Sequence, residues 1–466
     1  MRELTVFIDS NSKIPVYEQI YTYIKKEITN GHLVTGEALP SSRSLAESLQ
    51  ISRSTVLMAY DQLLAEGYIE TKPQKGYYVM EIEKGFGDND VQEEKVSKKD
   101  EKKKFLIDFS PVGIETNNFP YNEWRKISRQ IYAPENADLF DKGDIRGDYT
   151  LRKNISDYLR KSRGVNASPE MIVITAGHEC ALMMLNFLLD KGEFAMENPA
   201  YSKVYKTLGM YGRKVIPINL DEYGIDMEQL EKSNANIVYV TPSHQYPMGI
   251  VMSAGRRHEL LQWAMKDSSR YIIEDDYDSE FRYRGKPIPA LQGIDTSEKV
   301  IYIGTFSKSI SPGLRMSYMV LPHRLMTYFM EKFSFCSNTV SATDQRMVAM
   351  FMESGGFERH LGRMRNIYKN KHSAMLSELK TWENVEIMGE NAGAHMLLKV
   401  RNGMTENELI RKAEEADIRV YALSDCYIDA DCKANTDSIV ILGYAKLDDI
   451  TIIRGLSILK KQWRLE

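Results

Sequence analysis

Lys308 follows a run of apolar residues, Val300–Ile303, which is typical of a buried strand. Two hydroxyl residues, Thr305 and Ser307, precede the lysine, and Arg315 follows it seven positions later. An amine at the end of a strand can form a Schiff base with an aldehyde. Hydroxyls and a guanidinium are hydrogen-bond donors that suit a phosphate. The segment therefore predicts a site for a ligand that carries both an aldehyde and a phosphate.

Two further segments extend this prediction. Asp275, in "IIEDDYDSEF", can hold a pyridine nitrogen in its protonated form, which makes the ring an electron sink. Gly177 allows a ligand to approach the start of a helix near His178, where free N–H groups suit a phosphate. Each residue alone has an ordinary structural explanation, because a lysine after a strand is most often a surface lysine. Aldehyde, pyridine and phosphate in one ligand together predict pyridoxal phosphate.

Strands that carry these residues alternate with helical segments after residue 170. The runs "MIVIT", "NIVYVT", "RYIIEDD" and "KVIYIGT" are continuously apolar, which is typical of a mainly parallel sheet with both faces covered. Ligands of such sheets bind at the carboxyl ends of the strands. The sequence thus predicts an α/β unit with its site at that edge.

Composition indicates an ordinary globular protein, with 466 residues, 43% hydrophobic residues and a formal net charge of −4. No apolar run reaches the roughly 18 residues that cross a bilayer, and the N-terminal segment lacks the apolar core of a signal peptide. The four cysteines are scattered, so we expect neither a disulfide framework nor a metal site. We expect a cytoplasmic protein without a membrane partner.

Residues 81–106 are rich in charged residues and have no periodicity of a buried face, so they predict a solvated linker. This linker separates a domain of residues 1–80 from a domain of residues 107–466. Within the first domain, helical spacing predicts one helix near residues 16–28 and a closely spaced pair between residues 42 and 66. Two short strands, "YIET" and "GYYVM", follow as a hairpin. The order is that of a winged helix-turn-helix.

DNA binding is the physical interpretation of this domain. Ser52 can cap the second helix of the pair, which places Arg53, Ser54 and Thr55 in the turn that enters a major groove. Arg43, expected just before the supporting helix, and Lys75, at the tip of the hairpin, suit phosphates. Residues 1–80 carry 8 Lys and Arg against 9 Asp and Glu, so charge alone does not indicate nucleic acid. A protein-contact module remains the alternative.

The motifs "PSSR", "ISRSTV", "LLAEGYIE" and "KGYYV" resemble the winged helix of GntR-type regulators. The resemblance implies that Arg43, Arg53, Thr55 and Gly76 contact operator DNA.

Residues 107–466 are similar to fold-type I aminotransferases, a mostly parallel sheet with a smaller α+β subdomain. The similarity rests on "FPYNEWRK", "ITAGHECAL", "NPAYSKV", "TPSHQYPMG", "EDDYDSEFRY" and "GTFSKSISPGLR". Joined to the winged helix, the whole chain resembles the MocR-type regulators, in which the aminotransferase-like domain senses a ligand for the DNA-binding domain.

The resemblance implies a role for each matching position. Lys308 would hold the cofactor and Asp275 its ring nitrogen, with Tyr277 at the ring hydroxyl and Tyr201 against the ring. The phosphate would be bound by the backbone of Gly177, His178 and Glu179, together with Thr305, Ser307 and Arg315.

The sequence departs from the aminotransferase pattern in two places. The loop "TPSHQYPMG" has no clear equivalent of the usual asparagine, so Ser243, His244 and Gln245 are candidates for ring contacts. The late strand that usually carries an arginine for the substrate carboxylate has Ile441 or a neighbour at that place. Lys203, in "YSK", matches an arginine of some regulators and is the candidate for an anionic effector group, with Arg419 as an alternative.

We therefore expect a homodimeric transcriptional regulator that binds double-stranded DNA and pyridoxal phosphate. An amine or amino acid effector would displace Lys308 as an external aldimine. The alternatives are an active aminotransferase with an appended DNA-binding domain, and a sensor of pyridoxal phosphate itself.

Overall fold

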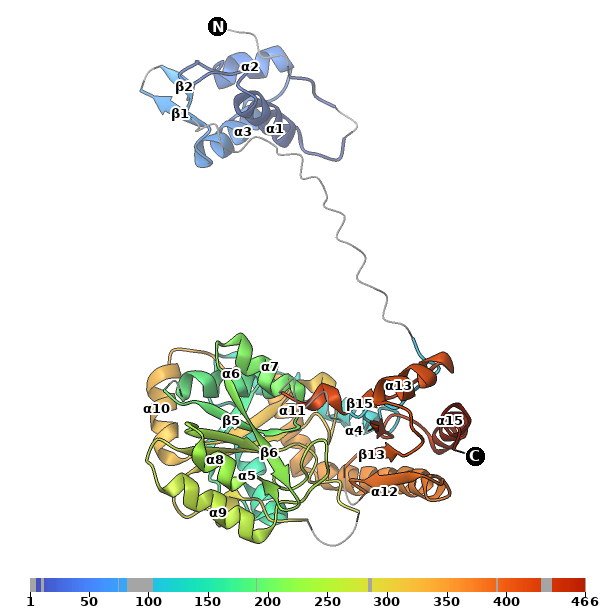
Figure 1. Cartoon of the computed structure of the whole chain (residues 1–466). Helices are drawn as coiled ribbons and strands as arrows, with labels where there is room; N and C mark the ends of the chain where they lie inside the picture. The colour runs from blue at the N-terminus through green and yellow to red at the C-terminus, as the bar shows by residue number, and fades with distance from the viewer. Residues whose placement is uncertain are drawn as a thin grey trace. The chain divides into compact units, whose positions relative to one another are not determined.

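The computed structural model describes residues 6–9, 12–73, 75–81, 104–189, 191–283, 287–390, 393–428 and 438–465. The chain forms two compact units, Met1–Lys103 and Lys104–Glu466 (Figure 1). Residues 82–103, most of the predicted linker, lie outside the described residues. No described helix is both long enough and apolar enough to cross a membrane.

The smaller unit consists of three helices and a hairpin. Helix α1 (Val16–Thr29) buries Ile20, Ile24 and Ile28, which lie on one face because they are four residues apart. Strands β1 and β2 pair antiparallel and pack against the helices, so the unit is the predicted winged helix-turn-helix. Its remaining elements are α2 (Ser42–Leu49), α3 (Arg53–Ala65), β1 (Ile69–Lys72) and β2 (Gly76–Val79).

Serine side chains cap both helices of the helix-turn-helix. Ser41 Oγ accepts a hydrogen bond from a backbone N–H of α2 at 3.1 Å, and Ser52 Oγ accepts one from the N–H of Thr55 at 3.3 Å. The cap predicted for Ser52 is thus observed. Because Ser41 is the other cap, Arg43 lies in the first turn of α2 and not before the helix, which corrects the prediction.

The core of the larger unit is an eight-stranded sheet with the order β4-β11-β10-β9-β8-β5-β6-β7. The pairings from β10 through β9, β8 and β5 to β6 are parallel, and those of β11 and β7 are antiparallel. The mainly parallel sheet agrees with the continuous apolar runs of the sequence. The strands are β4 (Ile172–Thr175), β5 (Phe194–Asn198), β6 (Val215–Asp221), β7 (Gly224–Ile225), β8 (Ile237–Val240), β9 (Tyr271–Asp276), β10 (Val300–Thr305) and β11 (Ser317–Val320).

Helices cover both faces of this sheet (Figure 1). In β9, Ile272 packs into the cluster formed with α8 and α9, whereas Ile273 packs on the opposite face with α6, α7 and α10. Helices α4, α5 and α11 cover the remainder of the first face. The helices are α4 (Tyr121–Ile131), α5 (Tyr149–Arg163), α6 (His178–Leu188), α7 (Ser202–Met210), α8 (Met227–Lys232), α9 (Ala254–Met265), α10 (His323–Phe333) and α11 (Ala342–Glu353).

Strand β11 brings two distant strands into register. Ser317 of β11 lies opposite Thr175 of β4 on one side and Thr305 of β10 on the other. Since β4 and β10 are both antiparallel to β11, they run in the same direction and end at the same edge. On the other side of β10, Ile303 lies beside Asp275 of β9. The segments that carry the predicted site residues therefore converge on one edge of the sheet.

A second, antiparallel sheet with the order β12-β13-β16-β15 lies in the C-terminal part of the same unit. It packs with the flanking helices around a separate apolar core that includes Trp382 and Trp463. Strand β3 (Ile107–Asp108) pairs in parallel with β14 (Ile418–Arg419), which ties the start of the unit to this part. Its other elements are α12 (Gly356–Leu379), β12 (Val385–Met388), β13 (His395–Val400), α13 (Glu406–Glu415), β15 (Tyr421–Ala422), β16 (Ile439–Gly443) and α15 (Asp449–Gln462).

Candidate functional site

Lys308 lies in the turn that follows β10, and its side chain is half-buried. Its Nζ donates a hydrogen bond to the carbonyl oxygen of Pro111 at 3.3 Å. Burial lowers the pKa of this amine to about 8, against the opposing effect of the negative charge of Asp278. A larger fraction of the amine is therefore neutral near pH 7 than for an ordinary lysine, as a nucleophile for an aldehyde requires.

Asp275 is a buried carboxylate at the end of β9. Tyr239, a residue of β8, donates its hydroxyl hydrogen to Asp275 Oδ2, and His178 Nε2 lies 3.5 Å from the same oxygen. Burial raises the pKa of Asp275, although His178 and the Tyr239 hydroxyl counteract the effect. A protonated ring nitrogen would give this carboxylate a cationic partner in the interior, so its surroundings fit a pyridinium.

Tyr239 was missed in the sequence analysis. It stands in the apolar run "NIVYVT" and looks like one more strand residue. The one sign in the sequence was a polar phenol in a strand that is otherwise aliphatic. The direction of this side chain could not be read from the sequence, because it depends on the pairing of β8 with β9. The side chain of His178, expected to contribute only its backbone N–H, lies beside this tyrosine, with Nε2 at 3.1 Å from the hydroxyl.

Gly177 caps α6 and forms a cradle with Arg315. Its φ of 82° lies in the left-handed region, and a Cβ at this position would lie 2.6 Å from Arg315 Nη2. The absence of a side chain thus lets the guanidinium approach the start of the helix. Helix N–H groups and a guanidinium at one place are suitable donors for a phosphate. The residues present therefore fit the phosphate of the predicted cofactor.

Three hydroxyl groups meet beside this cradle. Thr305 Oγ1 donates to Ser307 Oγ at 3.0 Å and accepts from Ser317 Oγ at 3.0 Å. The backbone N–H of Ser307 also donates to Thr305 Oγ1 at 3.1 Å. Ser317 was not predicted, and it is brought here by the reversed strand β11. The cluster shows that Thr305 and Ser307, predicted as phosphate donors, lie together.

The Arg315 guanidinium has an anionic partner within the protein. Its Nη2 donates to Glu179 Oε2 at 2.6 Å, and Lys203 Nζ lies 4.0 Å from Glu179 Oε1. Burial would raise the pKa of the Glu179 carboxyl, but the bond from Arg315, the backbone and the two cations outweigh it and lower the pKa. Lys203, the candidate for an effector contact, therefore lies next to Glu179 at the start of α7.

His244 is buried in a polar cluster. Its Nδ1 lies 2.9 Å from Asp278 Oδ2 and 3.1 Å from the hydroxyl of Tyr277. Its Nε2 is buried and has no hydrogen-bond partner among the described residues. Burial, followed by the charge of Asp278, raises the pKa of Tyr277 well above its usual value, so this phenol remains a donor. Asp278 was not singled out from the sequence, although it lies in the acidic run "EDDYDSE".

Ser243 and Gln245, the other candidates in this loop, have partners inside the protein. Ser243 Oγ accepts a hydrogen bond from Arg163 Nη2 at 2.6 Å. The amide nitrogen of Gln245 donates to the carbonyl oxygens of Pro199 at 2.8 Å and Tyr246 at 2.7 Å. These bonds hold the loop in place.

Tyr201 belongs to an aromatic group at the site. Its ring meets that of Tyr246 edge to face at a centroid distance of 5.5 Å, and Tyr246 lies 6.1 Å from Tyr277. Burial raises the pKa of Tyr201 to about 12, and Glu179, Asp275 and Arg315 also act on it electrostatically. Tyr201 is thus close enough to Asp275 and to Arg315 to interact electrostatically with both.

The position expected for an effector-binding arginine is apolar. Ile441 of β16 is buried in the cluster that includes Leu397 and Tyr246. Arg419, the alternative cation, is exposed, and its guanidinium lies 5.0 Å from the ring centroid of Tyr421.

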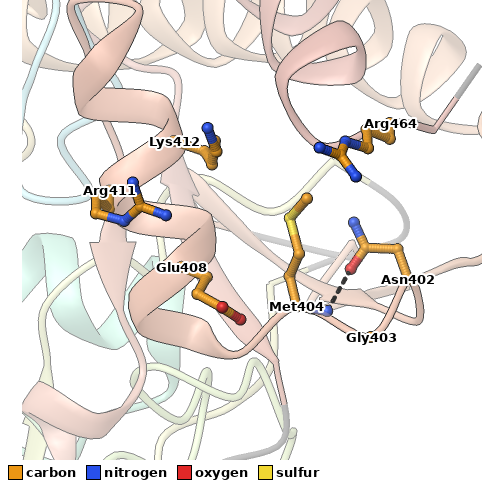
Figure 2. A pocket seen from close by; sticks show the side chains of 7 residues that line it. All are labelled: Asn402, Gly403, Met404, Glu408, Arg411, Lys412 and Arg464. Carbon is orange, nitrogen blue, oxygen red and sulfur yellow. Dashed lines mark hydrogen bonds between the residues drawn. The ribbon is translucent and has the colours of Figure 1, made fainter.

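A surface cavity of about 350 Å³ lies elsewhere in the larger unit, beside α13 (Figure 2). None of the residues predicted to act in the site lines it. Its lining residues are Asn402, Gly403, Met404, Glu408, Arg411, Lys412 and Arg464.

In the smaller unit, the candidate DNA contacts lie on the surface. Arg53 and Ser54 are exposed in the first turn of α3, and Thr55 is half-buried. Arg53 Nε donates to Ser42 Oγ at 3.2 Å, while Thr55 Oγ1 lies 2.8 Å from Ser52 Oγ. Arg43, on α2, is exposed as well, as are Lys75 and Gly76 at the hairpin. Gly76 has a φ of 98°, which suits glycine at the turn.

Comparisons with known families cover both units. The family model described as Bacterial regulatory proteins, gntR family, matches residues 16–79, and that of Aminotransferase class I and II matches residues 112–435. The likeness to solved structures concerns the fold of the larger unit. A multiple substrate aminotransferase from Thermococcus profundus has a TM-score of 0.69 at 23% identity, over 78% of this chain and 92% of that one.

Three relatives are similar to this chain over most of its length. The HTH-type transcriptional regulator YhdI of Bacillus subtilis is 38% identical over 99% of this chain and 98% of its own length. The probable rhizopine catabolism regulatory protein MocR of Rhizobium meliloti is 31% identical over 97% and 94%. The pyridoxine biosynthesis transcriptional regulator PdxR of Corynebacterium glutamicum is 30% identical over 85% and 86%.

Proposed function

Because the chain belongs to the MocR-type regulators, with a GntR-type helix-turn-helix domain and an aminotransferase-like domain, we propose that it is a transcriptional regulator controlled by pyridoxal phosphate chemistry. Lys308 would bind the cofactor covalently, and a small amine or amino acid would take the place of the lysine. The smaller unit would bind double-stranded DNA through α3 and the hairpin. We include in the proposal that the protein is a cytoplasmic homodimer.

The observation that carries this proposal is the convergence of three groups at one edge of the sheet. They are an amine of lowered pKa, a buried carboxylate of raised pKa, and a cradle of helix N–H groups and a guanidinium. Bound pyridoxal phosphate supplies an aldehyde for amines and a ring that accepts electrons. Asp275 would hold a proton at the ring nitrogen, and Tyr277 would donate to the ring hydroxyl.

Regulation requires that the effector distinguish two states of the protein. A ligand shifts an equilibrium only by the difference between its affinities for the two states. Release of Lys308 changes the charge beside Asp278, whose negative charge acts on the lysine in the present state. We propose that this change is the local event to which DNA binding responds.

A paired titration tests the proposal. Purified protein that contains pyridoxal phosphate is titrated with a panel of amines and amino acids, and the visible absorption and the affinity for DNA upstream of its own gene are followed together. We expect one compound to change both, with the same half-saturation. An absorption change without any change in DNA binding by any compound would contradict the regulatory role.

An active aminotransferase is the second candidate function, favoured by the presence of both Lys308 and Asp275. Against it, Ile441 lies in an apolar cluster at the position where aminotransferases carry an arginine for the substrate carboxylate. A substrate that is misplaced by about 1 Å can react about 100-fold more slowly. We therefore expect slow turnover or none. Steady amino-group transfer to a keto acid at about 1 s⁻¹ or faster would establish the enzyme instead.

A sensor of pyridoxal phosphate itself is the third candidate. One relative is named as a regulator of pyridoxine biosynthesis, and it is 30% identical to this chain. In that case the cofactor alone, added to cofactor-free protein, would change the affinity for DNA without any amine.

A further inference from the structure

Glu179 stands at the place where the phosphate of a ligand would be bound. It lies in the first turn of α6, whose N-terminal end begins at Gly177. One carboxylate oxygen accepts from Arg315 Nη2 at 2.6 Å, and the other lies 4.0 Å from Lys203 Nζ. An acidic side chain in the first turn and a bound phosphate stabilise a helix for the same reason, since both carry negative charge near free N–H groups. The Glu179 carboxylate thus already supplies, within the protein, the negative charge that a bound phosphate would place at the start of α6.

The two partners of this contact differ in the alternatives available to them. The guanidinium of Arg315 lies against the backbone at Gly177, where a Cβ would be only 2.6 Å from its Nη2. Both side chains are partly exposed, 55% for Arg315 and 40% for Glu179, but Glu179 has a second cation, Lys203, within reach. Exposed ion pairs contribute little to stability, so the carboxylate can exchange one cation for the other at small cost. Glu179 is therefore the side chain to which the structure offers a second ion-pair partner.

We propose that Glu179 competes with the phosphate of an incoming ligand for Arg315, and that the ligand binds by displacing the carboxylate toward Lys203. The inference rests on the proposed function, because it takes the start of α6 as the phosphate position. It also assigns Lys203 a role other than effector binding: Lys203 is the cation that receives Glu179. Binding of a phosphorylated ligand would then strengthen an ion pair between the first turns of α6 and α7.

The substitution Glu179→Gln tests the competition, with pyridoxal phosphate and pyridoxal as the two probes. It keeps the size of the side chain but removes its charge. We expect roughly 3- to 30-fold tighter binding of pyridoxal phosphate to cofactor-free protein, since one negative charge near the phosphate is removed. Pyridoxal has the same ring and aldehyde but no phosphate, so its affinity should stay unchanged. Equilibrium dialysis measures both dissociation constants without any turnover.

A matched control is Glu386→Gln. Glu386 forms an equally short pair with Arg401, 2.6 Å, in the second sheet of the larger unit, and this pair is also partly exposed. This substitution should alter the affinity for neither probe. Arg315→Gln should weaken pyridoxal phosphate binding, and in that background Glu179→Gln should have a much smaller effect, because the shared cation is gone.

The results separate the inference from the proposed function. If wild-type protein binds neither probe, the cofactor site itself is wrong. If the wild type binds pyridoxal phosphate and Glu179→Gln leaves its affinity unchanged or weaker while pyridoxal binding is retained, the competition is wrong and the cofactor site stands. Equal tightening of both probes would also overturn the inference, because it would show that the charge acts on the ring and not on the phosphate.

Discussion

The candidate cofactor site of the larger unit and the recognition helix of the smaller unit place their polar groups in opposite surroundings. Asp275 and Asp276 are buried at the end of β9, and each has partners inside the protein. Arg53 and Ser54 at the start of α3 are exposed, and Arg53 Nε donates a hydrogen bond to Ser42 Oγ. In the cofactor site, the protein itself supplies the partners of the polar side chains. In the recognition helix, the bound DNA would have to supply them.

This difference determines what a substitution can change. Removing one side chain from a buried polar cluster either leaves its neighbours without a hydrogen-bond partner or removes a repulsion between like charges. Both the stability of the unit and its affinity for the cofactor therefore change. Removing an exposed side chain leaves the folded unit almost unaffected and changes only the complex. Substitutions in each region therefore test this contrast.

Lys308→Ala should abolish the covalent link to pyridoxal phosphate completely, because no other amine would occupy the end of β10. Borohydride reduction followed by peptide mapping should label Lys308 in the wild type and nothing in the variant. Lys299→Ala is the control, since burial also lowers the pKa of this lysine but it lies at the other end of the strand. Label on any other lysine would break the assignment.

Two neighbouring aspartates should respond in opposite directions. Asp276 accepts a hydrogen bond from the buried Arg163 at 2.8 Å, so Asp276→Asn should destabilise the cofactor-free unit by about 3–5 kcal/mol. Burial raises the pKa of Asp275. At pH values above the ordinary aspartate pKa, the folded state therefore binds more protons than the unfolded state, and the unit loses stability as the pH rises. Asp275→Asn should therefore leave the cofactor-free unit as stable or more stable near pH 7.

The same Asp275→Asn variant should bind pyridoxal phosphate more weakly by about 2–5 kcal/mol, since the ring nitrogen loses its anionic partner. Chemical denaturation and equilibrium dialysis measure the two quantities on one sample. If Asp275→Asn destabilised the unit as much as Asp276→Asn, the carboxylate would have a structural role and the contrast would fail.

Arg53→Ala should weaken binding to the specific DNA site by about 1–3 kcal/mol and relax base preference there. Its melting temperature should match that of the wild type, because the side chain is exposed. Lys26→Ala, an exposed substitution on α1, serves as the control for DNA affinity. If Arg53→Ala weakened the affinity for specific and random DNA equally, Arg53 would contact phosphates and not bases.

The rate at which cofactor-free protein takes up pyridoxal phosphate should rise about tenfold between pH 7 and pH 9 and level off above about pH 9. The neutral amine is the reacting form, and the pKa of Lys308 is lowered to about 8. Stopped-flow absorbance at several pH values measures this profile. A rate that still rises steeply at pH 10 would mean that the amine is not shifted.

Lys75→Ala should have the smallest effect. It should weaken the affinity for every DNA sequence to a similar extent, and the slope of the logarithm of affinity against the logarithm of salt concentration should fall by about one. The side chain is exposed at the hairpin and has no role in the core. Affinity measured at several salt concentrations checks this. An unchanged slope would exclude a phosphate contact.

The backbone of the larger unit could be predicted well from the sequence where both faces of a strand are buried. The runs around Ile172, Ile237, Tyr271 and Val300 became β4, β8, β9 and β10 because each face packs against helices. The small strand pairs were not predicted, since β14 and β15 have two residues each and no pattern of their own.

The site was predictable in its ligand-facing residues and much less so in the contacts among them. Gly177 and Arg315 were expected near one phosphate, and the structure brings them together. The bond between Glu179 and Arg315 was not expected, because both were assigned to the same ligand. Tyr239 escaped notice since only the pairing of β8 with β9 decides that its hydroxyl reaches Asp275. Such contacts depend on strand register, which local sequence does not contain.

The position of β11 between β4 and β10 also has a consequence for the order in which the chain assembles. The β10–β11 pairing is local, with Ser317 only 12 positions after Thr305, whereas Thr175 on β4 is 142 positions before Ser317. Closing the longer loop costs more entropy and contributes to slow folding. The start of α6 therefore joins the hydroxyl cluster only when this distant pairing has formed. A ligand that needs both would bind only molecules in which this sheet is complete, and it would add stability to those molecules alone.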